Sequence, residues 1–253
     1  MHTLLDHPLV LLPVSFILLW LATRVGFAVR IWHGPDDEAR RGDFDMVLGA
    51  TLTLLSLIVA FSFSMAASRY DQRKNYEEGE ANAIGTAYAR ADLLPGADAS
   101  RVHVLLREYT DLRVRFYSTL NARQRRDLDS ATGRTQARLW GAVAAAASAA
   151  PTPLSALVAS AMNDVLNAQG YAQAAAWNRI PLGAWALLYV LGAVAMIMIG
   201  HRFQVEARGH LLMMIMPAIV GTAFFLIADI DCPESGVIRV APVNLMALAA
   251  ALS

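Results

Sequence analysis

The residues from Met46 to Ser68 form a run of 23 residues without one formal charge, and this run constrains the chain more than any other feature. About 20 apolar residues, at a helical rise of roughly 1.5 Å per residue, cross a hydrocarbon core of about 30 Å. A second uncharged run, of 21 residues, covers Ile180–Gly200. Each run predicts a membrane-spanning helix, because an exposed backbone in lipid finds no hydrogen-bond partner outside the helix itself.

Two further segments have the apolar character of a span. Pro8–Val29 is interrupted only by Arg24, which lies near enough to one end to snorkel toward the headgroups. A secretory signal peptide is the competing interpretation of this segment, and it fits poorly because no positive residue precedes the apolar run. Leu211–Ala228 is shorter, with 18 residues. The composition agrees with a membrane protein: 56% of the residues are hydrophobic, 17% are charged and the mean hydropathy is +0.41.

The polar segment between the second and third spans, Arg69–Arg179, carries apolar residues at helical spacing among arginines and acids. Turn-forming residues at Pro95–Gly96, Thr132–Gly133, Pro151–Pro153 and Gly170 divide it into three or four predicted helices. We therefore predict an all-α integral membrane protein with four transmembrane helices and a helical aqueous domain between spans two and three.

Four parts follow from this division. They are a first hairpin (1–68, with spans over about 8–29 and 46–68), the helical domain (69–179), a second hairpin (180–228, with spans over about 180–200 and 211–228) and a C-terminal tail (229–253). No Pro or Gly occurs between Ser68 and Gly79, so the second span is expected to continue as one helix into the aqueous domain. An even number of spans places both termini on one side of the membrane.

The chemistry-bearing residues give no sign of an enzyme. Basic and acidic residues balance at 21 each, so no global field favours nucleic acid as a partner. Cys232 is the single cysteine, which excludes an internal disulfide and a cysteine-based zinc cluster. We expect no catalytic residues, no cofactor and no metal. Asp229, Asp231 and Glu234 could bind a divalent cation, but a solvated exit from the fourth span is the simpler interpretation.

One face of the second span has a regular pattern. Thr53, Leu57 and Phe61 repeat every four residues, and the small residues Ser64 and Ser68 continue along the helix. Small residues allow helices to approach closely in lipid, so packing within a bundle is one interpretation. The other is a hydrophobic constriction that gates by dewetting when several copies surround an axis.

Longer motifs indicate a family. The run Phe61–Tyr70, followed by Arg73 and by Glu80–Tyr88, resembles the signature of the bacterial bestrophin-like domain family, as do Asn178–Pro181 and the closing segment Ala228–Val240. That family has no assigned biochemical function. The chain is more distantly similar to the bestrophins, which are homopentameric ion channels with four spans per subunit and a cytosolic helical domain between spans two and three.

The resemblance implies a homo-oligomer, a pentamer by analogy, whose axial pore passes small inorganic ions passively. It implies that the pore is lined by Thr53, Leu57, Phe61, Ser64 and Ser68, with Arg69, Tyr70 and Arg73 at its mouth. Thr53 departs from the channels, which carry a large apolar group there. The dense acidic run of the channels' calcium clasp is missing, so calcium activation is not carried over.

The resemblance also implies a multi-pass protein of the inner (plasma) membrane, with the termini and the helical domain in the cytoplasm. The positive residues flanking the spans leave the orientation undecided, because both sides carry similar numbers. The partners expected are the lipid bilayer, further copies of the chain and small ions, without nucleic acid. The rival hypothesis is a non-conducting membrane scaffold or sensor whose helical domain binds a partner.

Overall fold

The structure is a computed structural model, and it describes residues 7–33, 38–203 and 209–253. Within these residues the secondary structure consists of helices, which confirms the predicted all-α class. The chain divides into two compact units. Unit 1 comprises Met1–Arg69 and Arg179–Arg239, and unit 2 comprises Tyr70–Asn178 and Val240–Ser253.

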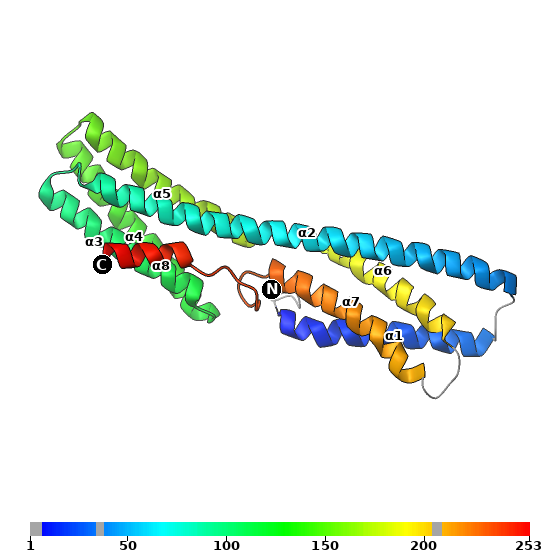
Figure 1. Cartoon of the computed structure of the whole chain (residues 1–253). Coiled ribbons are helices and arrows are strands. Elements are labelled where there is room, and N and C mark those ends of the chain that lie inside the picture. The colour runs from blue at the N-terminus through cyan, green and yellow to red at the C-terminus, as the bar shows by residue number, and fades with distance from the viewer. Residues whose placement is uncertain (1–6, 34–37, 204–208) are drawn as a thin grey trace. The chain divides into compact units, whose positions relative to one another are not determined.

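Unit 1 holds α1 (Pro8–His33), the first part of α2 (Glu38–Ala91), α6 (Leu182–Arg202) and α7 (Gly209–Asp231), as Figure 1 shows. Four segments of the described chain are long and apolar enough to cross a membrane, as predicted; they are Pro8–Trp32, Arg41–Ala91, Pro153–Arg202 and Leu211–Asp231. The helix α2 is uninterrupted from Glu38 to Ala91, which confirms that the second span continues into the polar segment.

Glycines bring α1 and α6 into backbone contact. A Cβ atom built on Gly200 would lie 1.9 Å from the carbonyl oxygen of Thr23, and one built on Gly26 would lie 1.8 Å from that of Ile197. Neither position has room for a side chain. Close approach through small residues is the usual way for helices to gain packing contacts in lipid, where no hydrophobic force drives them together.

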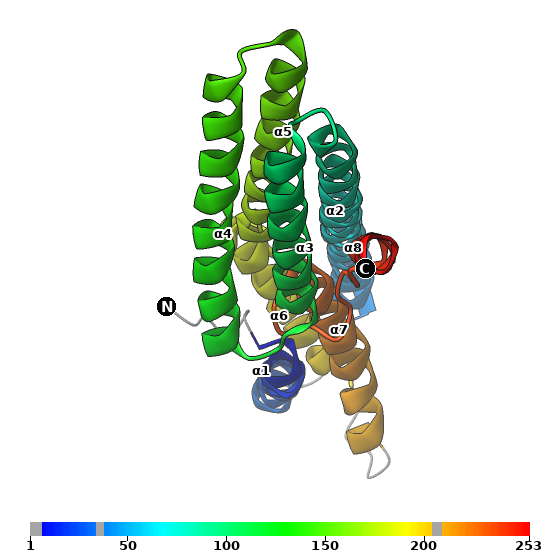
Figure 2. The same ribbon diagram turned by 90° about the vertical axis from the view of Figure 1, so that its left-hand side faces the viewer.

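Unit 2 holds the last part of α2 with α3 (Gly96–Ser118), α4 (Ala122–Ala149), α5 (Pro153–Trp177) and α8 (Val243–Leu252), and these helices are labelled in Figure 2. Its core combines apolar residues from every one of these helices; fully buried examples are Ile84, Leu106, Leu139, Met162 and Leu245. Amphipathic helices with one buried face fit a water-exposed helical domain.

Two of the predicted helix breaks in this unit are wrong. The helix α4 runs through Thr132–Gly133, and there the Thr132 hydroxyl donates to the Leu128 carbonyl oxygen at 2.8 Å within the helix. Likewise α5 runs through Gly170. The break between α3 and α4 instead lies at 119–121, where the Asn121 side chain accepts from two backbone amides and caps α4.

The break at Pro151–Pro153 is confirmed, with Thr152 and Ser155 forming a capping box at the start of α5. The helix α8 was not predicted. It lies within the segment expected as a C-terminal tail, and Leu245 places it in the core of unit 2.

Candidate functional site on helix α2

The helix α2 buries less of its apolar surface than any other candidate span. Only 11% of its most apolar window is buried inside the chain, against 28%, 28% and 39% for the other three. The buried side chains of its uncharged run are Leu55, Ser62 and Ala66, which lie about one or two turns apart on one side of the helix. This stripe is part of the contact with the rest of unit 1, where the Thr51 hydroxyl also lies 3.8 Å from the Met198 sulfur on α6.

The five residues predicted to line a pore lie on the opposite side. At 3.6 residues per turn, each falls within about 60° of the direction directly opposite to the buried stripe. All five are exposed in the single chain; they are Thr53, Leu57, Phe61, Ser64 and Ser68. Phe61 is 60% exposed and Leu57 is 48% exposed, although both are strongly apolar. The structure therefore brings the five onto one face without covering them.

Thr53 is less polar in place than its side chain suggests. Its hydroxyl donates to the carbonyl oxygen of Gly49 at 2.8 Å, so the donor is used within the helix. The helix carries a second bond of this kind, from the Ser56 hydroxyl to the Thr53 carbonyl at 2.8 Å. A threonine in this position exposes no free O–H donor, which reduces the contrast with a large apolar residue.

The three predicted mouth residues lie on the other side of α2 from the exposed face. The Nη1 atom of Arg69 lies 3.6 Å from Oδ1 of Asp231, at the end of α7. Arg73 is buried, with 6% exposure, and Tyr70 is half-buried. The positive charge of Arg69 is thus directed toward an acid rather than toward the exposed stripe, and the structure does not bring the two predicted groups together.

Asp231 joins three elements of unit 1. Besides its ion pair with Arg69, its two carboxylate oxygens accept the backbone N–H of Ile180, just before α6, at 3.2 and 3.1 Å. The side chain is 7% exposed. Charge-assisted hydrogen bonds to a buried carboxylate are stronger than neutral ones. Asp231 therefore fixes the end of α7 against the start of α6 and against α2.

The expectation of a solvated exit after the fourth span is wrong. Asp229 is 1% exposed, and its oxygens accept the backbone N–H groups of Val237 and Ile238 at 2.7 and 2.8 Å. The turn needs Gly236, because a Cβ atom there would lie 2.5 Å from the Asp229 carbonyl oxygen. The carboxylate of Asp229 thus closes a turn, whereas Glu234 is exposed. The described residues contain no group of three or more His, Cys, Asp or Glu side chains arranged to hold a metal ion.

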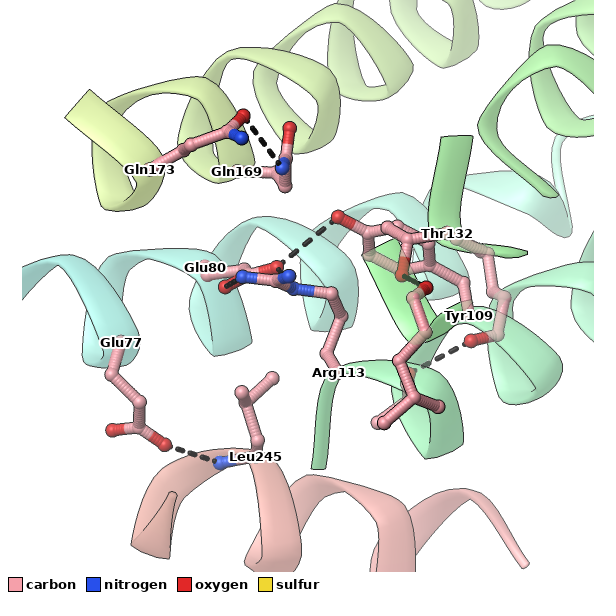
Figure 3. Close-up of polar contacts among 11 residues, drawn as sticks. Glu77, Glu80, Tyr109, Arg113, Thr132, Gln169, Gln173 and Leu245 are labelled. Atoms are coloured by element: carbon pink, nitrogen blue, oxygen red, sulfur yellow. Dashed lines mark hydrogen bonds and ion pairs between the residues drawn. The ribbon is translucent and has the colours of Figure 1, made fainter. Parts of the chain in front are cut away.

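Unit 2 contains a buried ionic network that the sequence did not reveal (Figure 3). The carboxylate of Glu80 on α2 is 0% exposed, and it accepts from Nε and Nη2 of Arg113 on α3 at 2.5 and 3.1 Å. The Tyr109 hydroxyl donates to the same carboxylate at 3.1 Å. A buried charge without partners is strongly unfavourable, and here Glu80 and Arg113 each provide the other's counter-charge.

The protonation of this network follows from its burial. Burial, and then the negative charge of Glu80, raise the pKa of Tyr109 well above its ordinary value. Burial works against the charged form of Arg113, but the adjacent Glu80 outweighs it and raises the pKa of the guanidinium. Arg113 therefore stays charged and Tyr109 stays neutral at physiological pH. Their role is to join α2 to α3.

The chain was compared with protein families and with curated proteins. A family model described as Bestrophin-like domain matches residues 15–245. A comparison with curated proteins found no match.

Solved structures share the fold. Two variants of a bacterial bestrophin homolog from Klebsiella pneumoniae are 14% identical to this chain. One has a TM-score of 0.62, covering 94% of this chain and 98% of that one. The other has a TM-score of 0.64, covering 95% and 93%. A further structure, titled only as a membrane protein, has a TM-score of 0.66 at 12% identity and covers 95% of this chain and 97% of that one. At this identity the likeness shows the fold alone.

Proposed function

The chain belongs to the bestrophin-like domain family, and from this premise we propose that it forms an oligomeric membrane channel that passes small inorganic ions passively. Several copies surround an axis, and each turns the exposed face of α2 toward it. Leu57 and Phe61 form the hydrophobic constriction, with Thr53 on one side and the hydroxyls of Ser64 and Ser68 on the other. A pentamer is the assembly that the resemblance to bestrophins favours.

The exposure of the α2 stripe is the observation that supports this proposal most. A strongly apolar helix that buries only 11% of its span inside its own chain has a surface left for lipid or for further copies. A stripe that carries hydroxyl groups at Ser64 and Ser68 suits a wet axis better than lipid. The opposite stripe, with Leu55 and Ala66, attaches the helix to its own subunit.

The proposal also includes a role for Arg69 and a location for the protein in the cell. Arg69 holds α2 against Asp231, so that its charge is balanced where the helix leaves unit 1. The protein is placed in the inner (plasma) membrane with the termini and unit 2 in the cytoplasm, as the family resemblance implies. Lipid and small ions are its partners, together with its own copies.

Ion flux into liposomes tests the constriction. Phe61→Ala is expected to raise the flux, because a smaller side chain widens the narrow ring and lets water enter. Phe63→Ala is the matched control, since Phe63 is also exposed, at 44%, but lies on another side of α2. The constriction is assigned wrongly if the wild type conducts and Phe61→Ala conducts equally.

The mass of the complex in detergent separates this proposal from its rival. A ring of four or more subunits supports an axial pore. A monomer excludes one, and with no flux it leaves the alternative function, a membrane scaffold or sensor whose unit 2 binds a partner.

A further inference from the structure

The helix α8 receives its N-terminal cap from another helix. Its own capping position, Pro242, has no side-chain cap. Glu77 on α2 supplies it instead, since one carboxylate oxygen accepts the backbone N–H of Leu245 at 2.9 Å (Figure 3). The other oxygen accepts a hydrogen bond from Nδ2 of Asn244 at 2.7 Å. A negative charge at this end also complements the helix dipole. Glu77 is 1% exposed, so water and salt screen its contacts with α8 only weakly.

The other end of α8 meets a positive charge. Arg107 on α3 donates from Nε to the carbonyl oxygen of Leu252 at 2.5 Å, and from Nη2 to the Tyr88 hydroxyl at 2.6 Å. A cation at the C-terminal end of a helix is favourable for the same reason as an anion at its start. The acid on α2 and the arginine on α3 thus each complement one end of the α8 dipole, and together they favour one direction of the helix.

Between its ends, α8 makes a thin apolar contact. Leu245 is its one fully buried side chain, and Leu248 is partly buried against the core. Val243 and Met246 are 65% and 55% exposed. By contrast, α3 buries seven side chains, so it belongs firmly to the core. The attachment of α8 depends on the two charged residues at its ends and on one leucine.

We propose that the surface of α2 and α3 that carries Glu77 and Arg107 binds α8 reversibly, as a strap that detaches while the core of unit 2 stays folded. Docking of the strap joins α2 to α3 beside the buried Glu80–Arg113 pair, and its release uncovers Glu77, nine residues beyond Ser68 on the same helix. This device does not depend on conduction, and its test measures docking directly.

Hydrogen exchange of the full chain in detergent micelles tests the strap. In the wild type, amides of α8 are expected to exchange at least ten-fold faster than those around Leu106 in α3, because local opening needs no unfolding of the core. Glu77→Gln should accelerate α8 by about a further ten-fold, since hydrogen bonds to a charged acceptor are lost, and leave α3 unchanged. Glu78→Gln, an exposed acid beside it, should change neither.

A second pair of variants acts through packing rather than charge. Leu245→Ala should accelerate exchange in α8 without affecting α3, whereas Met246→Ala, on the exposed side, should not. The proposal is overturned if α8 and α3 exchange at the same rate in the wild type. It is also overturned if Glu77→Gln matches Glu78→Gln, or if it accelerates α8 and α3 equally, because α8 would then be a fixed part of the core.

Discussion

Replacing Gly200 with alanine should separate α1 from α6. The added Cβ atom would lie 1.9 Å from the Thr23 carbonyl oxygen, and real Cβ atoms essentially never approach closer than 3.0 Å, so at least 3.0 − 1.9 = 1.1 Å must open between the two backbones. Overpacking of this kind destabilises by about 1–3 kcal/mol, and backbone atoms on both sides favour the upper end. Higher helix propensity of alanine returns up to about 1 kcal/mol, which leaves a net loss of about 1–2 kcal/mol.

Gly183→Ala is the matched control, because it lies in the same helix and its Cβ would meet nothing within 4 Å. Cys232 provides the assay: it is the single cysteine, 1% exposed, and it lies in unit 1, so a fluorogenic thiol reagent reports unfolding during a thermal ramp in detergent. Gly200→Ala should label at a lower temperature than the wild type, and Gly183→Ala at the same or a higher one. Equal melting of the two variants would refute the close packing of α1 and α6.

Other perturbations address the buried polar groups. Glu80→Gln leaves a buried arginine without its counter-charge and should lower the free energy of unfolding by about 3–5 kcal/mol in chemical denaturation; exposed Glu78→Gln should stay within about 0.5 kcal/mol, and equal losses would contradict the network. Asp231→Asn should lower the stability of unit 1 by about 1–3 kcal/mol in the thiol-labelling assay, since it weakens the ion pair with Arg69 and the hydrogen bonds to the Ile180 amide. An unchanged labelling temperature would show that these contacts do not stabilise unit 1. Because the pKa of Tyr109 is raised in the folded chain, the unfolded state loses this proton first. Stability should therefore fall above the ordinary value of 10, by up to about 1.4 kcal/mol per pH unit, and Tyr109→Phe should reduce that fall in alkaline denaturation.

The membrane helices could be predicted from the sequence because lipid imposes a simple requirement. An uncharged run of about 20 residues must be helical there, and such runs are visible without knowledge of any contact. The continuation of α2 beyond the second span could also be predicted, since no Pro or Gly follows Ser68 for ten positions. The glycine at position 79 interrupts nothing, because it lies on the surface of α2 with open space around it.

The helix ends in unit 2 were harder to predict. Gly133 and Gly170 are exposed and stay within helices whose other residues pack well, so tertiary packing outweighs their low helix propensity. The real break before α4 contains neither Pro nor Gly. Its signal was Asn121 at a capping position, which a search for helix-breaking residues passes over.

The sequence predicts which residues share a face of α2, but not the long-range contacts of this helix. The regular spacing of Leu57 and Phe61 placed them on one face, and the structure leaves that face uncovered. The direction of Arg69 depends on Asp231, which lies more than 160 positions away, and no local pattern indicates such a pair. The same holds for Glu80 and Arg113, whose burial results from the packing of two helices.

Current through the purified protein in planar bilayers tests most directly whether the exposed face of α2 lines a shared aqueous axis. With Cys232 replaced by serine, Leu57→Cys and Phe63→Cys place a thiol on the proposed pore face and on another exposed side of the helix. A water-soluble thiol reagent should block the current through Leu57→Cys and leave the current through Phe63→Cys unchanged. A reagent that blocks both equally or neither, or a protein that carries no current, would contradict the proposed pore.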